Sequence, residues 1–183
     1  AAIQFGRMIQ DYGIYWYEEP CRVESVDGLV EITRALPFPT ATGERLVGRW
    51  EFREVLEKRA CAIIQPDVSH TGGISEVRRI AAMAEPYLIS VACHNPQGPI
   101  ITSALVQICF AVPNYLIQEV VRADVPWRSD VVTQPLAVDT GWILPPTAPG
   151  LGIDVNEKEA EKHPYAPEIP MGCFHADGSV ADW

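Results

Sequence analysis

Five short apolar runs recur along the first 119 residues, and one ionisable side chain follows each of them. Stretches of about 10–15 residues with apolar positions at helical spacing separate the runs. Such alternation is typical of β-α units that build a parallel sheet, whose strands are covered by helices and apolar on both faces. The expected strands are residues 14–17, 40–42, 61–64, 87–92 and 115–118, and the expected helices are residues 3–12, 23–36, 50–59, 74–84 and 100–112.

The pattern changes after residue 123. Proline and glycine interrupt every periodic run from there on, and only residues 156–162 have the pattern of a short charged helix. We therefore expect two regions. Residues 1–123 form a partial barrel of β-α units that carries the strand-end residues, and residues 124–183 form a C-terminal wrapping segment and tail.

The ionisable residues occupy equivalent positions in successive β-α units, each just after an expected strand. Glu18, Glu44, Asp67, His94 and Glu119 follow the expected strands at intervals of 26, 23, 27 and 25 residues. Because the carboxyl ends of parallel strands meet at one rim of a barrel, where active sites are built, we expect these side chains to converge. Taken singly, an acidic residue after a strand is equally well explained as a helix cap or a solvated loop residue.

Gathered at one rim, these residue types have a definite chemistry. Carboxylates that lie close together repel, unless a cation offsets their charge. Oxygen ligands favour hard cations, and the two carboxylates of Glu18 and Glu44 suit Mg²⁺, which keeps waters or takes substrate oxygens. A carboxylate beside an imidazole fixes its tautomer and makes it a stronger base, so Asp67 and His94 form a candidate base. A base that faces a hard cation can take a proton from the carbon beside a carboxylate. The cation then stabilises the enediolate that forms.

The amino-acid composition limits the classes of partner and the compartment expected for this chain. The 183 residues hold 14 Lys and Arg against 24 Asp and Glu, a net charge of −10, which disfavours a nucleic-acid or anionic-membrane partner. No apolar run approaches the ~20 residues of a membrane span. The five cysteines form no Cys-x-x-Cys pair, so neither a disulfide framework nor a thiolate zinc site is indicated, and a cytoplasmic protein is expected.

Four motifs, taken in order, resemble a known superfamily: residues 16–20 (WYEEP), 42–45 (TGER), 65–74 (QPDVSHTGGI) and 94–100 (HNPQGPI). They are similar to the enolase superfamily, to its mandelate racemase subgroup, and within it to the galactonate dehydratase-like acid-sugar dehydratases. The end of the chain, residues 175–183, also resembles the end of those dehydratases. The resemblance covers nearly the whole chain, and it implies an Mg²⁺ cofactor, an acid-sugar substrate and a homo-oligomer.

The resemblance also implies roles. Glu18 and Glu44 correspond to metal ligands, and Asp67 and His94 to the catalytic dyad, with His94 as general base or acid. Glu119 corresponds to a residue that hydrogen-bonds the substrate carboxylate or the enediolate oxygen. The neighbouring acid of the first motif, at position 19, is expected to support its loop. The sequence around the base is Cys-His-Asn where Pro-His-Cys is expected in close relatives, a change that bears on substrate range.

Other family features have no counterpart here: a third metal ligand on an earlier strand, basic residues on a still earlier strand, and an N-terminal α+β capping domain. A complete barrel of this kind needs about 250 residues. We therefore expect an α/β fold that is the C-terminal part of a modified (β/α)7β TIM-like barrel, with the capping domain and first strands absent.

Three functions remain open. The first is Mg²⁺-dependent dehydration of an aldonic acid to a 2-keto-3-deoxy acid. The second is a racemase or epimerase of a 2-hydroxy acid, which uses the same dyad with a second base on the opposite face. The third is a metal-independent glycoside hydrolase barrel with Glu44 and Glu119 as its acid and nucleophile or base.

Overall fold

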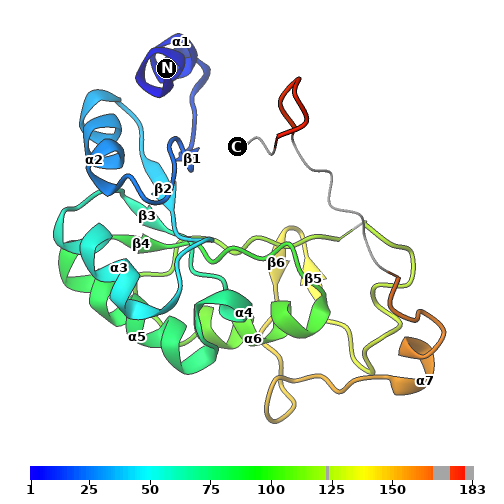
Figure 1. Ribbon diagram of the computed structural model, residues 1–183. Coiled ribbons are helices and arrows are strands. Elements are labelled where there is room, and N and C mark those ends of the chain that lie inside the picture. The colour runs from blue at the N-terminus through cyan, green and yellow to red at the C-terminus, as the bar shows by residue number, and fades with distance from the viewer. Residues whose placement is uncertain (123, 167–173, 180–183) are drawn as a thin grey trace.

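The computed structural model describes residues 1–122, 124–166 and 174–179. Its helices and strands are α1 (Ala2–Ile9), η1 (Gln10–Tyr12), β1 (Tyr17–Glu18), α2 (Val26–Ala35), β2 (Thr40–Thr42), α3 (Gly48–Glu57), β3 (Ile63–Ile64), α4 (Val68–Thr71), α5 (Ile74–Ala84), η2 (Glu85–Tyr87), β4 (Ser90–Val91), α6 (Pro99–Cys109), β5 (Val138–Asp139), β6 (Trp142–Ile143) and α7 (Glu157–Ala160). Figure 1 shows the alternation of helices and short strands through the first half of the chain.

The strands β1 to β4 form one sheet in chain order, and every neighbouring pair is parallel. The register is continuous: Glu18 lies opposite Ala41, Ala41 opposite Ile63, and Ile63 opposite Ser90. All four strands therefore end at the same edge, and the loops that follow them start side by side. The prediction of parallel β-α units is confirmed.

Both faces of this sheet are buried. The neighbouring residues Ile63 and Ile64 belong to different clusters, because side chains alternate across a strand. Ile64 and Val91 face the large cluster formed with the helices, whose fully buried members include Phe52, Leu56, Val77, Ile80 and Leu105. Ala41, Ile63 and Ala92 form a smaller cluster on the other face, with Trp16 and Leu116 packed against it. This two-sided burial explains why β2, β3 and β4 contain no charged residue and why the two threonines of β2, Thr40 and Thr42, are themselves buried.

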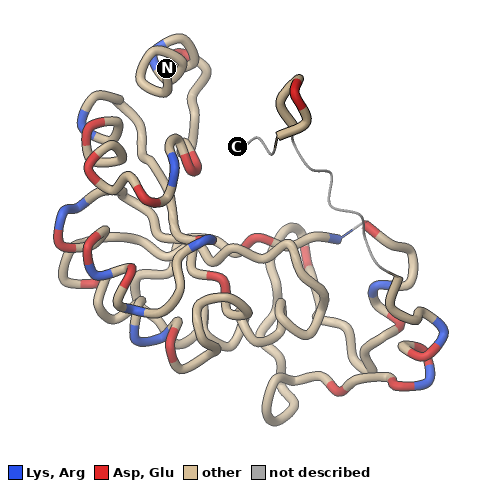
Figure 2. Tube along the Cα trace, viewed as in Figure 1, with Lys and Arg blue, Asp and Glu red and all other residues tan. Residues whose placement is uncertain are grey.

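The covering helices are amphipathic. Phe52, Val55 and Leu56 are the buried positions of α3, which packs against α5, and α5 packs against α6. Figure 2 shows Lys, Arg, Asp and Glu on α2, α3 and α5 and around α7, whereas α6 and the strands β2, β3 and β4 carry none. Within the described residues, no helix has the length and apolar character that crossing a membrane requires.

The fifth expected strand is shorter than predicted. Residues 115–118 contribute only one parallel bridge, between Tyr115 and Val91. Two backbone hydrogen bonds hold it, from Val91 N to Asn114 O at 2.9 Å and from Leu116 N to Val91 O at 2.8 Å. The run nevertheless continues the sheet beyond β4 in the expected place, so its end lies beside the loop that carries His94.

The C-terminal region contains elements that the sequence pattern did not indicate. The antiparallel hairpin of β5 and β6 faces α6 and residues 115–122 across a cavity of about 580 Å³. The expected helix of residues 156–162 is present as the shorter α7. The ring of His163 stacks on Trp127, with centroids 4.0 Å apart, and so ties the residues after α7 to the start of this region.

Candidate active site

Four of the predicted site residues lie at or just after the carboxyl ends of the strands of the sheet. Glu18 is the last residue of β1, Glu44 lies two residues past β2, and Asp67 and His94 each lie three residues past β3 and β4. Because the strands are parallel and in register, these positions share one edge. Close contacts link three of them directly: His94 Nδ1 lies 2.9 Å from Asp67 Oδ2, and His94 Nε2 lies 3.5 Å from Glu44 Oε2.

Asp67 is the most enclosed member of the group, with a fully buried side chain. It is the N-cap of α4, where its Oδ1 accepts hydrogen bonds from Ser69 N at 2.7 Å and Ser69 Oγ at 2.5 Å. Its other oxygen, Oδ2, faces His94 Nδ1 and also accepts from Gln97 Nε2 at 3.0 Å. Burial by itself raises the pKa of Asp67, but the hydrogen bonds from Ser69, His94 and Gln97 together lower it below the ordinary value.

An ionised Asp67 determines the tautomer of His94. A carboxylate only accepts hydrogen bonds, so the imidazole proton lies on Nδ1 and points at Oδ2. The opposite nitrogen, Nε2, is then the basic one, and it is the atom that faces Glu44. The His94 side chain is 18% exposed, so Nε2 is held in place while the ring remains reachable.

The pKa of Glu44 is shifted in the opposite direction to that of Asp67. Burial raises its pKa, the nearby His94 opposes this, and the charges of Glu19 and Glu18 together with a hydrogen bond to Glu18 raise the pKa further. Glu44 and Glu18 are thus two acids close enough to share a proton. Because each disfavours ionisation of the other, this corner of the site favours either protonation or a cation.

The two acids fit a hard cation, by the chemistry of their donors. Carboxylate oxygens are the ligands that Mg²⁺ prefers, and one or two of them are enough because the ion keeps waters or takes substrate oxygens. Glu18 is oriented through a single oxygen, Oε2, which accepts from Trp16 Nε1 at 3.0 Å and Gln65 Nε2 at 2.8 Å. In the part of the chain that the structure describes, no group of three or more His, Cys, Asp or Glu side chains is arranged to hold a metal.

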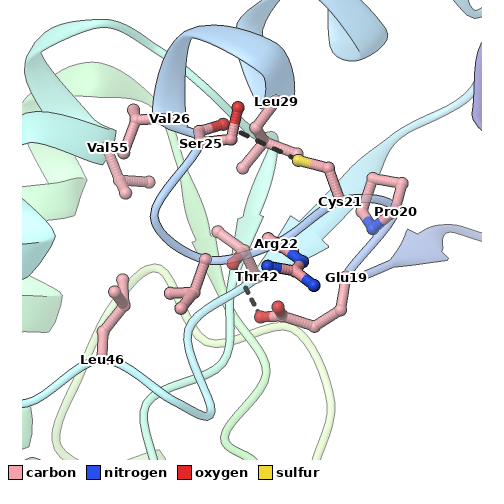
Figure 3. A pocket seen from close by; sticks show the side chains of 11 residues that line it. Glu19, Pro20, Cys21, Arg22, Ser25, Val26, Leu29, Thr42, Leu46 and Val55 are labelled. Carbon is pink, nitrogen blue, oxygen red and sulfur yellow. Dashed lines mark hydrogen bonds between the residues drawn. The ribbon is translucent and has the colours of Figure 1, made fainter. Parts of the chain in front are cut away.

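Glu19 supports the loop, as its sequence context suggested. Its Oε1 accepts from Thr42 Oγ1 at 2.7 Å and Gly43 N at 3.1 Å, and its Oε2 pairs with Arg45 Nη2 at 2.6 Å. Figure 3 shows the bond between Glu19 and Thr42 beside the start of the loop to α2. These contacts hold Glu19 at a φ of 44°, in the left-handed region that non-glycine residues seldom adopt, next to Glu18.

Gly43 is required where β2 turns into the site. Its φ is +140°, and a Cβ at this position would lie 2.9 Å from Gln65 N and 3.0 Å from a ring carbon of Phe52. The backbone before Glu44 can therefore approach Gln65 closely only without a side chain. This explains the Thr-Gly-Glu motif in physical terms.

Glu119 is joined to the loop of the base. Its Oε2 accepts from Asn95 N at 2.6 Å, and its backbone carbonyl accepts from Asn95 Nδ2 at 2.9 Å. The Asn95 side chain is fully buried and also donates to Thr102 Oγ1 at 2.9 Å. The residue that replaces the expected cysteine after His94 therefore contacts Glu119 and α6, and it holds two neighbouring strand ends together.

Sequence reasoning missed three polar residues of the site. Gln65, Ser69 and Gln97 each hydrogen-bond a predicted catalytic or metal-binding carboxylate. All three lie inside the motifs already recognised, within three residues of Asp67 or His94, and this proximity was the available signal.

Comparison with known proteins agrees with this arrangement. The family model described as "Enolase C-terminal domain-like" matches residues 1–159. The chain belongs to the enolase C-terminal domain-like family. The resemblance to this superfamily and the barrel-portion fold inferred from the four motifs are thereby confirmed.

Known relatives match this chain both in sequence and in structure. D-galactonate dehydratases from Ralstonia nicotianae and Variovorax paradoxus are 38% and 37% identical to this chain, over 97% and 91% of its length and 48% and 46% of theirs. Solved mandelate racemase/muconate lactonizing enzymes from Sulfitobacter and Jannaschia superpose with a TM-score of 0.86 each. Their identities are 40% and 35%, over 91% and 92% of this chain and 41% and 43% of theirs. The chain spans about half the length of the curated relatives it matches.

Proposed function

We propose that this chain carries the base and two metal ligands of an Mg²⁺-dependent dehydratase that converts an aldonic acid into a 2-keto-3-deoxy acid. The observation that carries the proposal is the position of His94. Its Nδ1 is bound to a buried, ionised Asp67, and its Nε2 faces the acid pair of Glu44 and Glu18. A base is thereby directed at the place where a cation would hold the carboxylate of a substrate.

The residues divide the reaction between them. His94 Nε2 takes the proton from the carbon beside the substrate carboxylate, and Asp67 stabilises the imidazolium that forms. Glu119, anchored through Asn95, lies at the next strand end and serves the enediolate oxygen or the carboxylate. The 3-hydroxyl then departs as water with the proton that the His94 imidazolium returns, which restores the base, and the resulting enol tautomerises to the 2-keto-3-deoxy acid.

Glu18 and Glu44 would hold the cation. With Mg²⁺ bound there, the site would supply positive charge to offset the negative charge that develops on the substrate carboxylate. The raised pKa of Glu44 supports this assignment, because a cation relieves the repulsion between the two acids. The relatives named D-galactonate dehydratases support an acid sugar as the substrate class.

The test is a screen of aldonic acids with the full-length protein, scored by formation of an α-keto acid. A positive substrate is then assayed with chelator, and again after Mg²⁺ is restored. Deuterium incorporation from D₂O at the α-carbon reports the first step separately.

The same assays separate the three functions. Keto-acid formation that needs Mg²⁺ supports the dehydratase. Deuterium exchange with inversion and no keto acid indicates the racemase or epimerase. Activity that survives both chelation and His94→Asn overturns the proposal and favours the glycoside hydrolase.

A further inference from the structure

The loop after β4 places a second side chain on the acid of the dyad. Gln97 Nε2 donates to Asp67 Oδ2 at 3.0 Å, the same oxygen that His94 Nδ1 contacts at 2.9 Å. Gln97 also lies 3.4 Å from Ser69 Oγ, the hydroxyl that donates to the other oxygen of Asp67. The Gln97 amide thus bridges the residues that surround this carboxylate.

This contact has a geometric consequence. Ser69 donates only to Oδ1 of Asp67. If His94 Nδ1 were the one donor to Oδ2 among the described residues, the carboxylate plane of Asp67 could turn about its Cβ–Cγ bond. The Gln97 amide supplies a second donor on Oδ2 and thereby fixes that plane. Because the imidazole plane follows the direction of its bond to Oδ2, the orientation of His94 Nε2 depends on Gln97.

The backbone of Gln97 is held in turn by the region that follows the barrel strands. Arg128 Nη1 donates to Gln97 O at 2.8 Å, and the Arg128 side chain is only 12% exposed. Its remaining guanidinium nitrogens bind both oxygens of Asp124. This pairing lowers the pKa of Asp124 to about 2, so the pair is ionised at neutral pH.

We propose that Gln97 is a positioning residue that orients the Asp67–His94 dyad, and that Arg128 holds Gln97 in register from outside the barrel. The inference rests on the proposed function for its kinetic consequence. Its geometric part, the orientation of the imidazole, stands without it. It also gives the C-terminal region a role at the site through a contact that the sequence pattern does not reveal.

The first test replaces Gln97 with methionine, which keeps the length of the side chain but removes the amide donor. In the full-length protein we expect kcat to fall about 10-fold with KM changed less than about 2-fold, because the base is misaligned while the substrate contacts remain. Gln107→Met is the matched control: Gln107 is similarly half-buried on α6, outside the site, and its replacement should leave kcat unchanged.

The second readout does not depend on turnover. The Nδ1 proton of His94, held against Asp67, should give a downfield proton resonance by NMR, assigned by its loss in His94→Asn. We expect Gln97→Met to shift or broaden this resonance and Gln107→Met to leave it in place. Arg128→Met should move it in the same direction by a smaller amount, because Gln97 keeps its side chain there.

The outcomes are distinct. A shifted resonance together with the kcat-specific loss supports the positioning role. An unchanged resonance overturns it, even if activity falls, because the loss would then come from general destabilisation. A shifted resonance in a protein that neither exchanges the α-proton nor forms a keto acid keeps the positioning role and overturns the proposed dehydratase.

Discussion

The two halves of the candidate site differ in how their charges are compensated. On one side, the buried Asp67 is surrounded by donors from Ser69, His94 and Gln97, which lower its pKa despite burial. On the other side, Glu44 meets further acids, and burial with their charges raises its pKa. The pKa values of two carboxylates at the same edge of one sheet are thus shifted in opposite directions by their surroundings.

This difference indicates which half works alone and which requires a partner. The base side is internally satisfied, because the acid, the imidazole and the side chains that donate to the acid all come from the segments that directly follow β3 and β4, with Ser69 on α4. Among the residues that the structure describes, Glu44 has no comparable set of donors, and a cation would complement the acid pair. Each prediction below tests one side of this comparison.

Removal of metal should have the largest effect. Chelation of the full-length protein should abolish α-keto acid formation to the background of the assay, and added Mg²⁺ should restore it, because the developing enediolate would lose its counter-charge. The measurement is turnover of the best aldonic acid before chelation, after chelation and after repletion. Full activity in the chelated protein would mean that the acid pair is not a metal site.

Loss of the base should come next. His94→Asn should lower the rate of α-proton exchange about 10²–10⁴-fold, the usual contribution of a general base, while Mg²⁺ binding is retained. Exchange is followed by NMR in D₂O, and metal affinity by calorimetry. If the variant exchanges its substrate at the parent rate, the proton is removed by another residue.

Asp67→Asn should lower kcat by a similar or smaller factor, about 10²–10⁴-fold, because an amide can present its NH₂ to Nδ1 and so favour the wrong imidazole tautomer. The pKa of Asp67 is lowered in the folded protein, so its charge adds stability above its unfolded value of about 3.9, and that stability is lost as the pH falls through the folded value. Unfolding of the variant by denaturant should therefore show the largest deficit near neutral pH and a shrinking one in acid.

Glu44→Gln should have the smallest effect on stability, and of opposite sign. The raised pKa of Glu44 means that its contribution is fully present below the unfolded value of about 4.3 and is lost as the pH rises through the folded value. Without metal at pH 7, the variant should be more stable than the parent, because a neutral amide avoids the charge that burial and the neighbouring acids disfavour. Denaturant unfolding at pH 4 and pH 7 measures this.

The response of the melting temperature to Mg²⁺ is the control for Glu44→Gln. Mg²⁺ should raise the melting temperature of the parent and leave that of Glu44→Gln nearly unchanged, since a neutral amide is a poorer ligand for this ion. A variant that is less stable than the parent at pH 7 without metal would contradict the picture of two repelling acids.

Much of the barrel portion was predictable because its signals are local. Runs such as residues 61–64 are apolar on both faces, and helical stretches separate them, so strand type and order could be inferred before pairing was known. The bounds were less predictable: the run at 115–118 pairs only at Tyr115, since edge pairing depends on neighbours that the local sequence does not encode. The four-residue helix α4 was missed because its start is marked by the Asp67 cap and by little else.

The sequence by itself determined the alternation of strands and helices, the family, and the spacing that brings Glu18, Glu44, Asp67 and His94 to one edge. Those properties follow from apolar periodicity and from motif order. Only the tertiary structure decided that Gln97 contacts Asp67, that Asn95 holds Glu119, and that Arg128 reaches the loop of the base. These contacts join residues 24 to 31 positions apart, and a hydrogen bond of about 3 Å depends on the packing of whole β-α units.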